Sequence, residues 1–184
     1  MTLREQIQNY KPYNEQEQQY KELMLRYIEK FPDVLTRENP LCHFTASNWI
    51  VNAHKTKVIM VYHNIYQSWS WTGGHADGEE NLLAVARKEA EEETGLQNLR
   101  LLGDGIHALQ ILTVNSHVKR GSYVAPHLHL DCCFLFEADE TETIRMKEDE
   151  NSGIKWVDID KAVELSTEEQ MKPIYEKLNA KIFI

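Results

Sequence analysis

The stretch from Gly74 to Leu96, GHADGEENLLAVARKEAEEETGL, decides the fold of this chain. Nothing between Glu80 and Thr94 breaks a helix, and Gly95 is well placed to end one in a left-handed cap. At about 100° per residue, one helix face is apolar in its first turns and acidic in its last turns. The acidic residues of that face are Glu89, Glu92 and Glu93. Carboxylates that point toward the protein body need a counter-charge, and a divalent cation is the obvious one.

A solvated acidic helix is the alternative interpretation of the same run. Like charges at i, i+3 or i+4 cost a helix a few tenths of a kcal/mol, and acidic groups in the last turns oppose the macrodipole at roughly 0.3–1 kcal/mol each. The nearby cation, Lys88, precedes its partners, which is the weaker orientation. The charge run alone is typical of a solvent-exposed helix face. The glycines that flank it favour a metal-binding site instead.

Those glycines complete a pattern that resembles the Nudix box, GX5EX7REUXEEXGU, in which U is a bulky aliphatic residue. Gly74, Glu80 and the run Lys88–Leu96 match six of the seven fixed residues over 23 positions. The exception is Lys88, which stands where the family has arginine, and Ala90 is smaller than the usual aliphatic residue. The preceding segment, SWSWTGGHADGEE, is similar to the strand and glycine turn that lead into the Nudix helix.

The resemblance implies hydrolysis of the pyrophosphate linkage in a nucleoside diphosphate joined to another moiety, of the nucleotide sugar, ADP-ribose, nucleoside triphosphate or dinucleotide type. It also implies Mg²⁺ or Mn²⁺ as cofactor, with Glu89, Glu92 and Glu93 as metal ligands. The Gly74 carbonyl is a candidate fourth ligand, and Glu80 is a peripheral carboxylate that acts through water. Carboxylates alone repel a polyanionic pyrophosphate, whereas a hard cation binds both groups.

The attacking water needs a proton acceptor as well. Glu89 and Glu93 are the first candidates, and Glu150 is the second, although its loop KEDENSG is equally typical of a solvated turn. Lys88 supplies charge without the planar fork of an arginine, so we expect less precise positioning of a glutamate and not loss of activity. The alternative is a nucleotide-binding protein whose degenerate box does not cleave.

A second polar pattern is HLHLD, residues 127–131. On a strand, His127, His129 and Asp131 share one face. Two histidines and a carboxylate are typical ligands of Fe²⁺ or Zn²⁺, which gives an alternative of another class, a cupin-like metal enzyme. The simpler interpretation is a polar strand face that lines a cleft and contacts substrate.

The expected partner is a small nucleoside diphosphate derivative. Trp71 is a candidate for stacking on a base, Arg120 for holding a phosphate, and His127 and His129 for hydrogen bonds to the substrate. Buried aromatics and solvated loop cations are the commoner roles of such residues.

Composition narrows the function classes. A net charge of −9 argues against binding to nucleic acid and against a Nudix-like transcription sensor. Apolar runs are too short for a membrane span, and the start lacks the apolar core of a signal peptide. Three cysteines, an odd number with two adjacent, indicate reduced thiols, and we expect a cytoplasmic protein.

The length of 184 residues indicates one domain with an appendage. We expect a helical extension over residues 1–40, which serves in packing, in a cleft wall or in a homodimer contact, and a Nudix-like domain over 41–184. The predicted strands are 43–52, 57–63, 65–71, 99–103, 107–115, 127–137 and 154–157, and helices over 160–165 and 167–181 close the chain. The resemblance implies an α+β fold, an α/β/α sandwich with a mixed sheet between helices.

Overall fold

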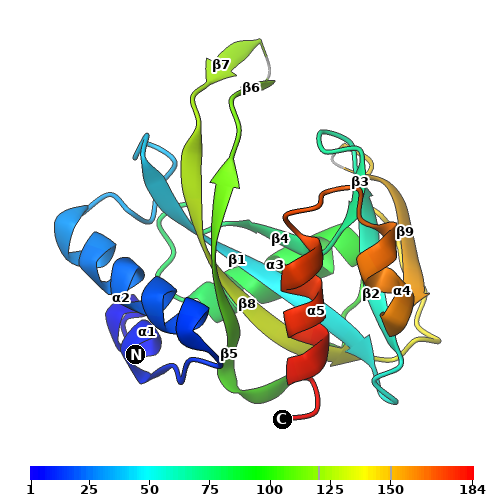
Figure 1. Ribbon diagram of the computed structural model, residues 1–184. Helices are drawn as coiled ribbons and strands as arrows, with labels where there is room; N and C mark the ends of the chain where they lie inside the picture. The colour runs from blue at the N-terminus through cyan, green and yellow to red at the C-terminus, as the bar shows by residue number, and fades with distance from the viewer. Residues whose placement is uncertain (120, 150) are drawn as a thin grey trace.

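A mixed seven-stranded sheet lies at the centre of the molecule in the computed structural model, which describes residues 1–119, 121–149 and 151–184 (Figure 1). Its order is β3-β2-β1-β8-β5, with β4 paired to β1 and β9 paired to β2. The central strands β1 (Cys42–Asn52) and β8 (His127–Ala138) run parallel, with His43 opposite His129. The other strands of the sheet are β2 (Lys57–His63), β3 (Ser68–Ser70), β4 (Thr72–His75), β5 (Arg100–Val114) and β9 (Asn151–Asp158).

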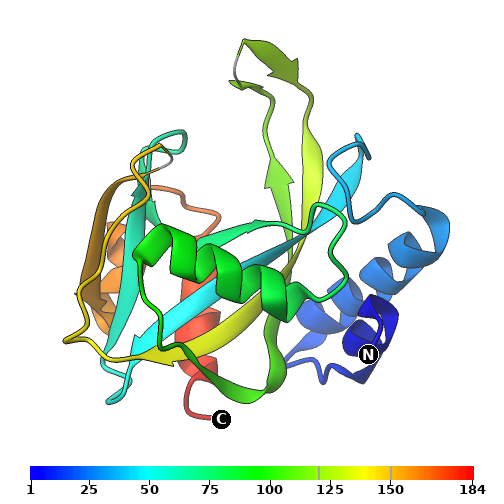
Figure 2. The ribbon, with the colours of Figure 1, turned by 180° about the vertical axis from the view of Figure 1, so that it is seen from behind.

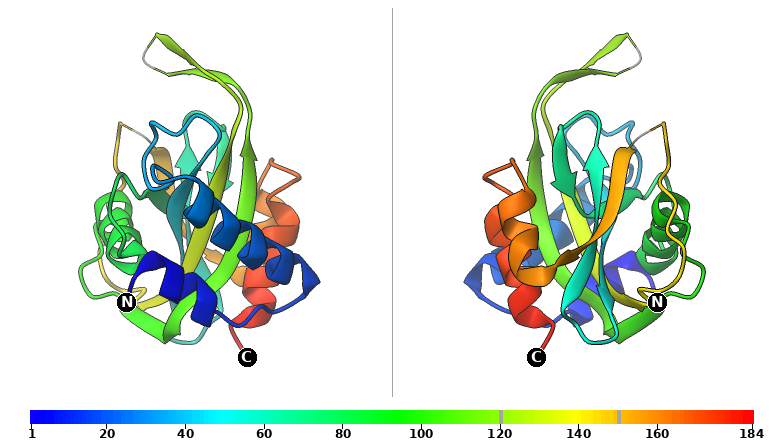
Figure 3. Two further views of the ribbon diagram at one scale, coloured as in Figure 1. Left: turned by 90° about the vertical axis from the view of Figure 1, so that its left-hand side faces the viewer. Right: turned by 90° about the vertical axis from the view of Figure 1, so that its right-hand side faces the viewer.

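Helices cover both faces of this sheet. Helix α3 (Leu82–Thr94) lies on one face, in front of the sheet in Figure 2. Helices α4 (Ile159–Leu165) and α5 (Lys172–Lys181) lie on the other face, so that Figure 3 shows the sheet between two helical layers. Successive residues of a strand point to opposite faces, and β1 and β8 therefore supply a core to each layer. The predicted α/β/α sandwich is confirmed.

Two N-terminal helices, α1 (Leu3–Asn9) and α2 (Glu15–Lys30), lie beside the edge strand β5. They share the core of the α3 layer, and a buried ion cluster joins α2 to α5. Glu17 is fully buried, 3.1 Å from Nζ of Lys177 and 3.2 Å from Nζ of Lys181, and it accepts a hydrogen bond from the Tyr10 hydroxyl. Burial acts to raise the pKa of Glu17, but these hydrogen bonds and lysines hold it below its ordinary value. The N-terminal segment is thus packed into the body.

Several predicted boundaries are wrong, and the strand predicted over 154–157 extends over Asn151–Asp158. The single strand over 65–71 is a turn with a left-handed Gln67 followed by the short β3. The strands over 99–103 and 107–115 form one strand, β5, whose pairing with β8 is interrupted between Leu101 and Ala108. Helix α3 begins at Leu82 and not Glu80, because Asn81 is its N-cap. Helix α5 begins at Lys172, since a turn precedes it and Pro173 occupies its first turn.

The segment after β5 forms a hairpin that the sequence did not predict. Strands β6 (His117–Lys119) and β7 (Ser122–Val124) pair antiparallel and project from the body at the top of Figure 1. They continue from β5 and lead into β8, so the hairpin rises beside the first residues of β8. None of the described helices is long and apolar enough to span a bilayer.

Candidate active site

The predicted acidic site lies where β4 meets α3. Asn81 caps the helix by accepting the Ala84 N–H at 3.2 Å, and Gly95 ends it with a left-handed φ of 75°. The apolar stripe of α3 is buried against the sheet, which fixes the rotation of the helix about its axis; its members are Leu82, Val85, Ala86 and Ala90. This rotation turns Glu89 and Glu93 toward the glycines of β4.

Gly74 allows the closest approach between the strand and the helix. A Cβ at this position would lie 2.6 Å from Oε1 of Glu89 and would overlap the rest of that carboxylate. The missing side chain therefore makes the space that Glu89 occupies. Glu89 itself is half-buried. The sequence predicted both residues as metal ligands, and the fold brings them into contact.

Glu93 is the most constrained of the three helix carboxylates. Its side chain is 3% exposed, and its two oxygens accept hydrogen bonds from the Gly73 N–H at 2.8 Å and from the amide of Asn151 at 3.0 Å. Gly73 belongs to β4 and Asn151 to β9, so one carboxylate joins the helix to two strands. Hydrogen bonds of this kind favour the charged form of a buried carboxylate and fix its direction.

The prediction that Glu92 faces the protein body together with Glu89 and Glu93 is wrong, because Glu92 points away from the sheet and contacts cations. Its oxygens lie 3.6 Å from Nζ of Lys88 and 3.5 Å from Nζ of Lys147, and its side chain is 41% exposed. Lys88 is more exposed still, which places the substituted box position at the rim of the site. Sequence reasoning missed Lys147 and Asn151, because both come from the segment beyond β8 and no local motif connects them with the helix.

The donors at this junction fit a hard divalent cation. Three carboxylates and a backbone carbonyl are the oxygen ligands that Mg²⁺ and Mn²⁺ prefer. The glycine at position 74 leaves room beside Glu89, whereas any side chain there would fill the space. Within residues 1–119, 121–149 and 151–184, however, the one group of three ligand atoms already gathered within 4.8 Å of one another is made of histidines.

The remaining predicted site residues are distributed around this junction. Glu80 is exposed in the loop before α3, and its carbonyl accepts from the side-chain amide of Gln6 at 3.3 Å. Trp71 is half-buried, with its ring edge-on to Tyr175 at a centroid distance of 5.7 Å. Glu150 and Arg120 lie outside the described residues.

The HLHLD pattern of β8 folds differently from the predicted two-histidine and carboxylate set. Asp131 is buried, and its oxygens accept from the Thr45 hydroxyl at 2.8 Å and the Ser47 hydroxyl at 2.6 Å. Burial raises the pKa of Asp131 to about 7, against the effect of both hydroxyls. Both carboxylate oxygens of Asp131 therefore bind side chains of β1, and His127 and His129 contact other residues. The predicted cupin-like ligand set is wrong.

Those neighbours are two further histidines. The ring of His43 lies 4.9 Å from the rings of His127 and His129, and His75 lies 4.9 Å from His129, as centroid distances. Burial, reinforced by the neighbouring imidazoles, lowers the pKa of His129 to about 2. Sequence reasoning missed His43 and His75 because their approach depends on the pairing of β1 with both β8 and β4.

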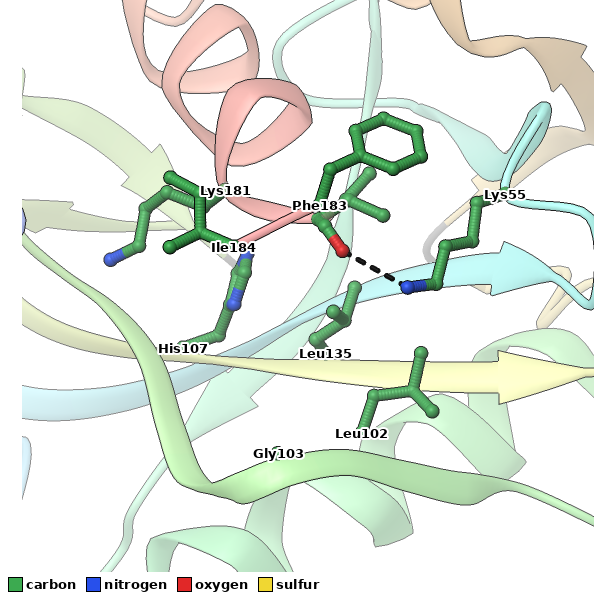
Figure 4. Close-up of a pocket in the computed structure, with 9 residues that line it drawn as sticks. Lys55, Leu102, Gly103, His107, Leu135, Lys181, Phe183 and Ile184 are labelled. Carbon is green, nitrogen blue, oxygen red and sulfur yellow. Dashed lines mark hydrogen bonds between the residues drawn. The ribbon is translucent and has the colours of Figure 1, made fainter.

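A surface cavity of about 440 Å³ lies elsewhere, between β5, β8 and the end of α5 (Figure 4). It is lined by Leu102, His107, Leu135 and Phe183, and by Lys55, whose ammonium donates to the Ile182 carbonyl at 3.1 Å. Among the described residues it contains none of the carboxylates of α3. We therefore place the candidate active site at the β4–α3 junction and not in this cavity.

Comparison with known proteins identifies a family model and several similar folds. A family model described as the NUDIX domain matches residues 43–178. Among solved structures, the Ap4A hydrolase of C. elegans is 18% identical with a TM-score of 0.57, covering 76% of this chain and 97% of that one. RenU, a Nudix hydrolase of M. smegmatis, is 16% identical with a TM-score of 0.57, covering 77% and 86%.

A third similar structure is the dihydroneopterin triphosphate pyrophosphohydrolase of E. coli. It is 16% identical with a TM-score of 0.54, covering 73% of this chain and 92% of that one. No curated protein matches the sequence. At these identities the structural likeness shows the fold, and the family model shows the family.

Proposed function

Because the chain belongs to the Nudix family, whose members hydrolyse pyrophosphate bonds, we propose that it cleaves a nucleoside diphosphate linked to a second moiety, with a divalent cation as cofactor. The observation that carries this proposal is the fit between the glycines of β4 and the glutamates of α3. Glu89 fills the space beside Gly74, and Glu93 accepts the N–H of Gly73. A helix that served only as a packing element would have no reason to place two carboxylates against a glycine strand.

We assign the metal site to Glu89, Glu92 and Glu93, with the Gly74 carbonyl as a further oxygen donor. Mg²⁺ or Mn²⁺ held there supplies charge neutralisation at the phosphoryl oxygens and lowers the pKa of bound water. Glu80, exposed in the loop before the helix, is assigned to an outer role through water.

The hydrogen bonds separate the roles of the two inner glutamates. Both oxygens of Glu93 are engaged by N–H donors of β4 and β9, so its carboxylate is fixed in one direction. We assign it as a fixed ligand and assign proton acceptance from the attacking water to Glu89, which is half-buried beside Gly74. Glu150, the second base predicted from the sequence, lies outside the described residues.

Two lysines provide the cationic side of the proposed site. Lys147 lies 3.5 Å from Glu92 and is only 27% exposed, whereas Lys88 lies 3.6 Å from the same carboxylate and is 68% exposed. We assign Lys147 to the orientation of Glu92, a task that the box arginine has in the family. The ammonium groups of Lys88 and Lys147 then act together at the place where the family has one planar arginine guanidinium.

The substrate class follows from the chemistry of the site. Hard-cation ligands in an otherwise acidic chain favour a compact anion that brings its own phosphates to the metal, rather than a nucleic acid. Two of the three similar structures named above act, by their own descriptions, on Ap4A and on dihydroneopterin triphosphate. We therefore propose a small nucleotide-type anhydride as substrate. The three free, buried thiols suit the reducing cytoplasm, where we place the protein.

The test is a substrate screen in the presence of Mg²⁺ and Mn²⁺. Its panel contains nucleotide sugars, ADP-ribose, dinucleoside polyphosphates, nucleoside triphosphates and coenzyme A, and phosphate release is measured. Turnover of the best substrate should fall at least about a hundredfold in Glu89→Gln and in Glu92→Gln, which corresponds to about 2.7 kcal/mol of transition-state stabilisation. Glu91→Gln, on the same helix but outside the proposed ligand set, is the matched control and should keep its activity.

Two results would contradict the proposal. Absence of metal-dependent turnover on every member of the panel would indicate a nucleotide-binding protein that does not cleave. Equal loss of activity in Glu91→Gln would show that the charge of the helix matters and not the positions of its carboxylates.

A further inference from the structure

Four imidazoles gather on the face of the sheet opposite α3. His43 comes from β1, His75 from β4, and His127 and His129 from β8. One ring nitrogen from each of His43, His75 and His129 lies within 4.8 Å of the others. Three strands therefore bring nitrogen donors to one point, although the donors are separated by up to 86 residues in the sequence.

His43 is oriented as a ligand. It is 4% exposed, and its Nδ1 lies 3.5 Å from the Asn39 carbonyl, which can only accept. The proton of the neutral ring is then on Nδ1, and Nε2 carries a lone pair. This Nε2 atom is buried and has no hydrogen-bond partner among the described residues. A buried lone pair without a partner is costly, and a carbonyl that fixes the other ring nitrogen is the usual support of a metal-binding histidine.

His127 adds a fourth donor with the same support. Its Nδ1 lies 2.9 Å from the Ala125 carbonyl, so its Nε2 also carries a lone pair. That Nε2 atom accepts a hydrogen bond from Nε2 of His129 at 3.2 Å, so metal binding through both atoms moves the His129 proton to its Nδ1. Ligand nitrogens about 2.1 Å from a tetrahedral zinc ion lie about 3.4 Å apart. The pair is thus already at the spacing of two zinc ligands, while the wider trio needs side-chain shifts of about an ångström.

We propose that His43, His75 and His129 bind a first-row transition-metal ion of the Zn²⁺ class, with His127 as the fourth ligand. All four donors are imidazole nitrogens, which suit zinc and its neighbours and not Mg²⁺. The site is separate from the carboxylate site because neighbouring residues of β4 point to opposite faces: Gly74 meets Glu89, whereas His75 meets the histidines.

Such an ion would connect β1, β4 and β8 on the opposite side of β4 from Glu89. His75 is next to Gly74, so the metal would hold the backbone from which the carboxylate site is built. The proposed role is structural, and it does not depend on the reaction proposed above.

The test is metal analysis of the full chain without an affinity tag. We expect one Zn²⁺ per chain after incubation with zinc and removal of excess ion, and competition with a chromophoric chelator gives its affinity. His75→Ala and His129→Ala should each weaken binding by about a hundredfold or more, since even outer residues of a metal site contribute tenfold to a hundredfold. His54→Ala, which changes an exposed turn histidine, and Glu92→Gln, which changes the carboxylate site, should bind zinc as the wild type does.

X-ray absorption at the zinc edge of the wild-type protein keeps the test valid if a histidine variant fails to fold. An imidazole nitrogen shell supports the site. A shell of oxygen ligands only, wild-type protein without stoichiometric zinc, zinc retained in both histidine variants, or zinc lost in Glu92→Gln would each overturn it.

Discussion

On the α3 side of the sheet Gly74 of β4 meets the carboxylate of Glu89, whereas on the opposite side its neighbour His75 meets the imidazoles of His43 and His129. The carboxylate side depends on an absent side chain and on a backbone donor, since Gly74 leaves room for Glu89 and the Gly73 N–H binds Glu93. The histidine side depends on strand pairing, since each donor comes from a strand and none from a helix. Alternation along β4 therefore turns two neighbouring residues toward different sites: Gly74 toward the Glu89 carboxylate and His75 toward the imidazoles.

The largest expected effect tests whether Glu93 acts through its charge or only through its hydrogen bonds. In Glu93→Gln the new amide group must face an N–H donor of Gly73 or Asn151, which leaves a buried donor unsatisfied at about 1–3 kcal/mol. We expect a lower melting temperature and a fall in turnover of about a thousandfold, or roughly 4 kcal/mol.

The matched variant for this experiment is the double exchange Glu93→Gln with Asn151→Asp. In this variant the amide of residue 93 donates to the carboxylate of residue 151, which restores a hydrogen bond between the two side chains. Thermal denaturation should therefore show that most of the stability is regained, while turnover stays low. Recovery of turnover together with stability would mean that Glu93 has only a structural role.

The next effect tests the contact that defines the carboxylate side. In Gly74→Ala the added methyl group overlaps the Glu89 carboxylate, so the helix must shift or Glu89 must leave the site. Overpacking of this kind costs about 1–3 kcal/mol, and we expect turnover to fall about a hundredfold. In a double-mutant cycle with Glu89→Ala, stability should recover because the overlap disappears, and activity should not. Additive losses in denaturation measurements would show that the two residues do not compete for space.

The carboxylate side was largely predictable from the sequence, and the histidine side was not. The box is a local pattern, in which helix periodicity correctly turns Glu89 and Glu93 toward the strand that the glycines mark, while Glu92 lies at the exposed edge of that face. The partners that complete it, Asn151 and Lys147, depend on the return of the chain through β9 and the loop before it.

The histidine cluster needs the parallel pairing of β1 with β8, a long-range contact that no periodicity reveals. Asp131 illustrates this limit. The strand pattern correctly predicted that Asp131 and His129 lie on the same face of β8. The pattern did not predict that the hydroxyls of Thr45 and Ser47, on the neighbouring strand β1, donate hydrogen bonds to Asp131.

A half-buried histidine outside the cluster, His107, separates the effect of desolvation on a pKa from the effect of neighbouring imidazoles. His107, on β5, has its pKa lowered to about 4, mainly by burial, with Lys181 contributing. The unfolded chain then binds more protons than the folded chain between about pH 6.5 and pH 4, so stability falls as the pH is lowered through this window. The wild type should lose unfolding free energy between about pH 6.5 and pH 4. In His107→Gln this loss should be smaller by an amount on the order of 2 kcal/mol. Denaturant titrations at several pH values measure it, and an unchanged slope would assign the acid sensitivity to other groups.

The smallest expected effect concerns the one fixed position where the box departs from its family. Lys88 is 68% exposed and lies 3.6 Å from Glu92, and a surface pair of this kind contributes about 0–1 kcal/mol. Lys147 contacts the same carboxylate from a less exposed position. We therefore expect Lys88→Arg to change turnover by less than about threefold, and Lys147→Ala to lower it more, because that variant removes the better-buried cation. Steady-state rates of both variants at saturating Mg²⁺ decide between the two lysines. A severalfold loss in Lys88→Arg, with Lys147→Ala unaffected, would show that the rim lysine and not the inner one orients Glu92.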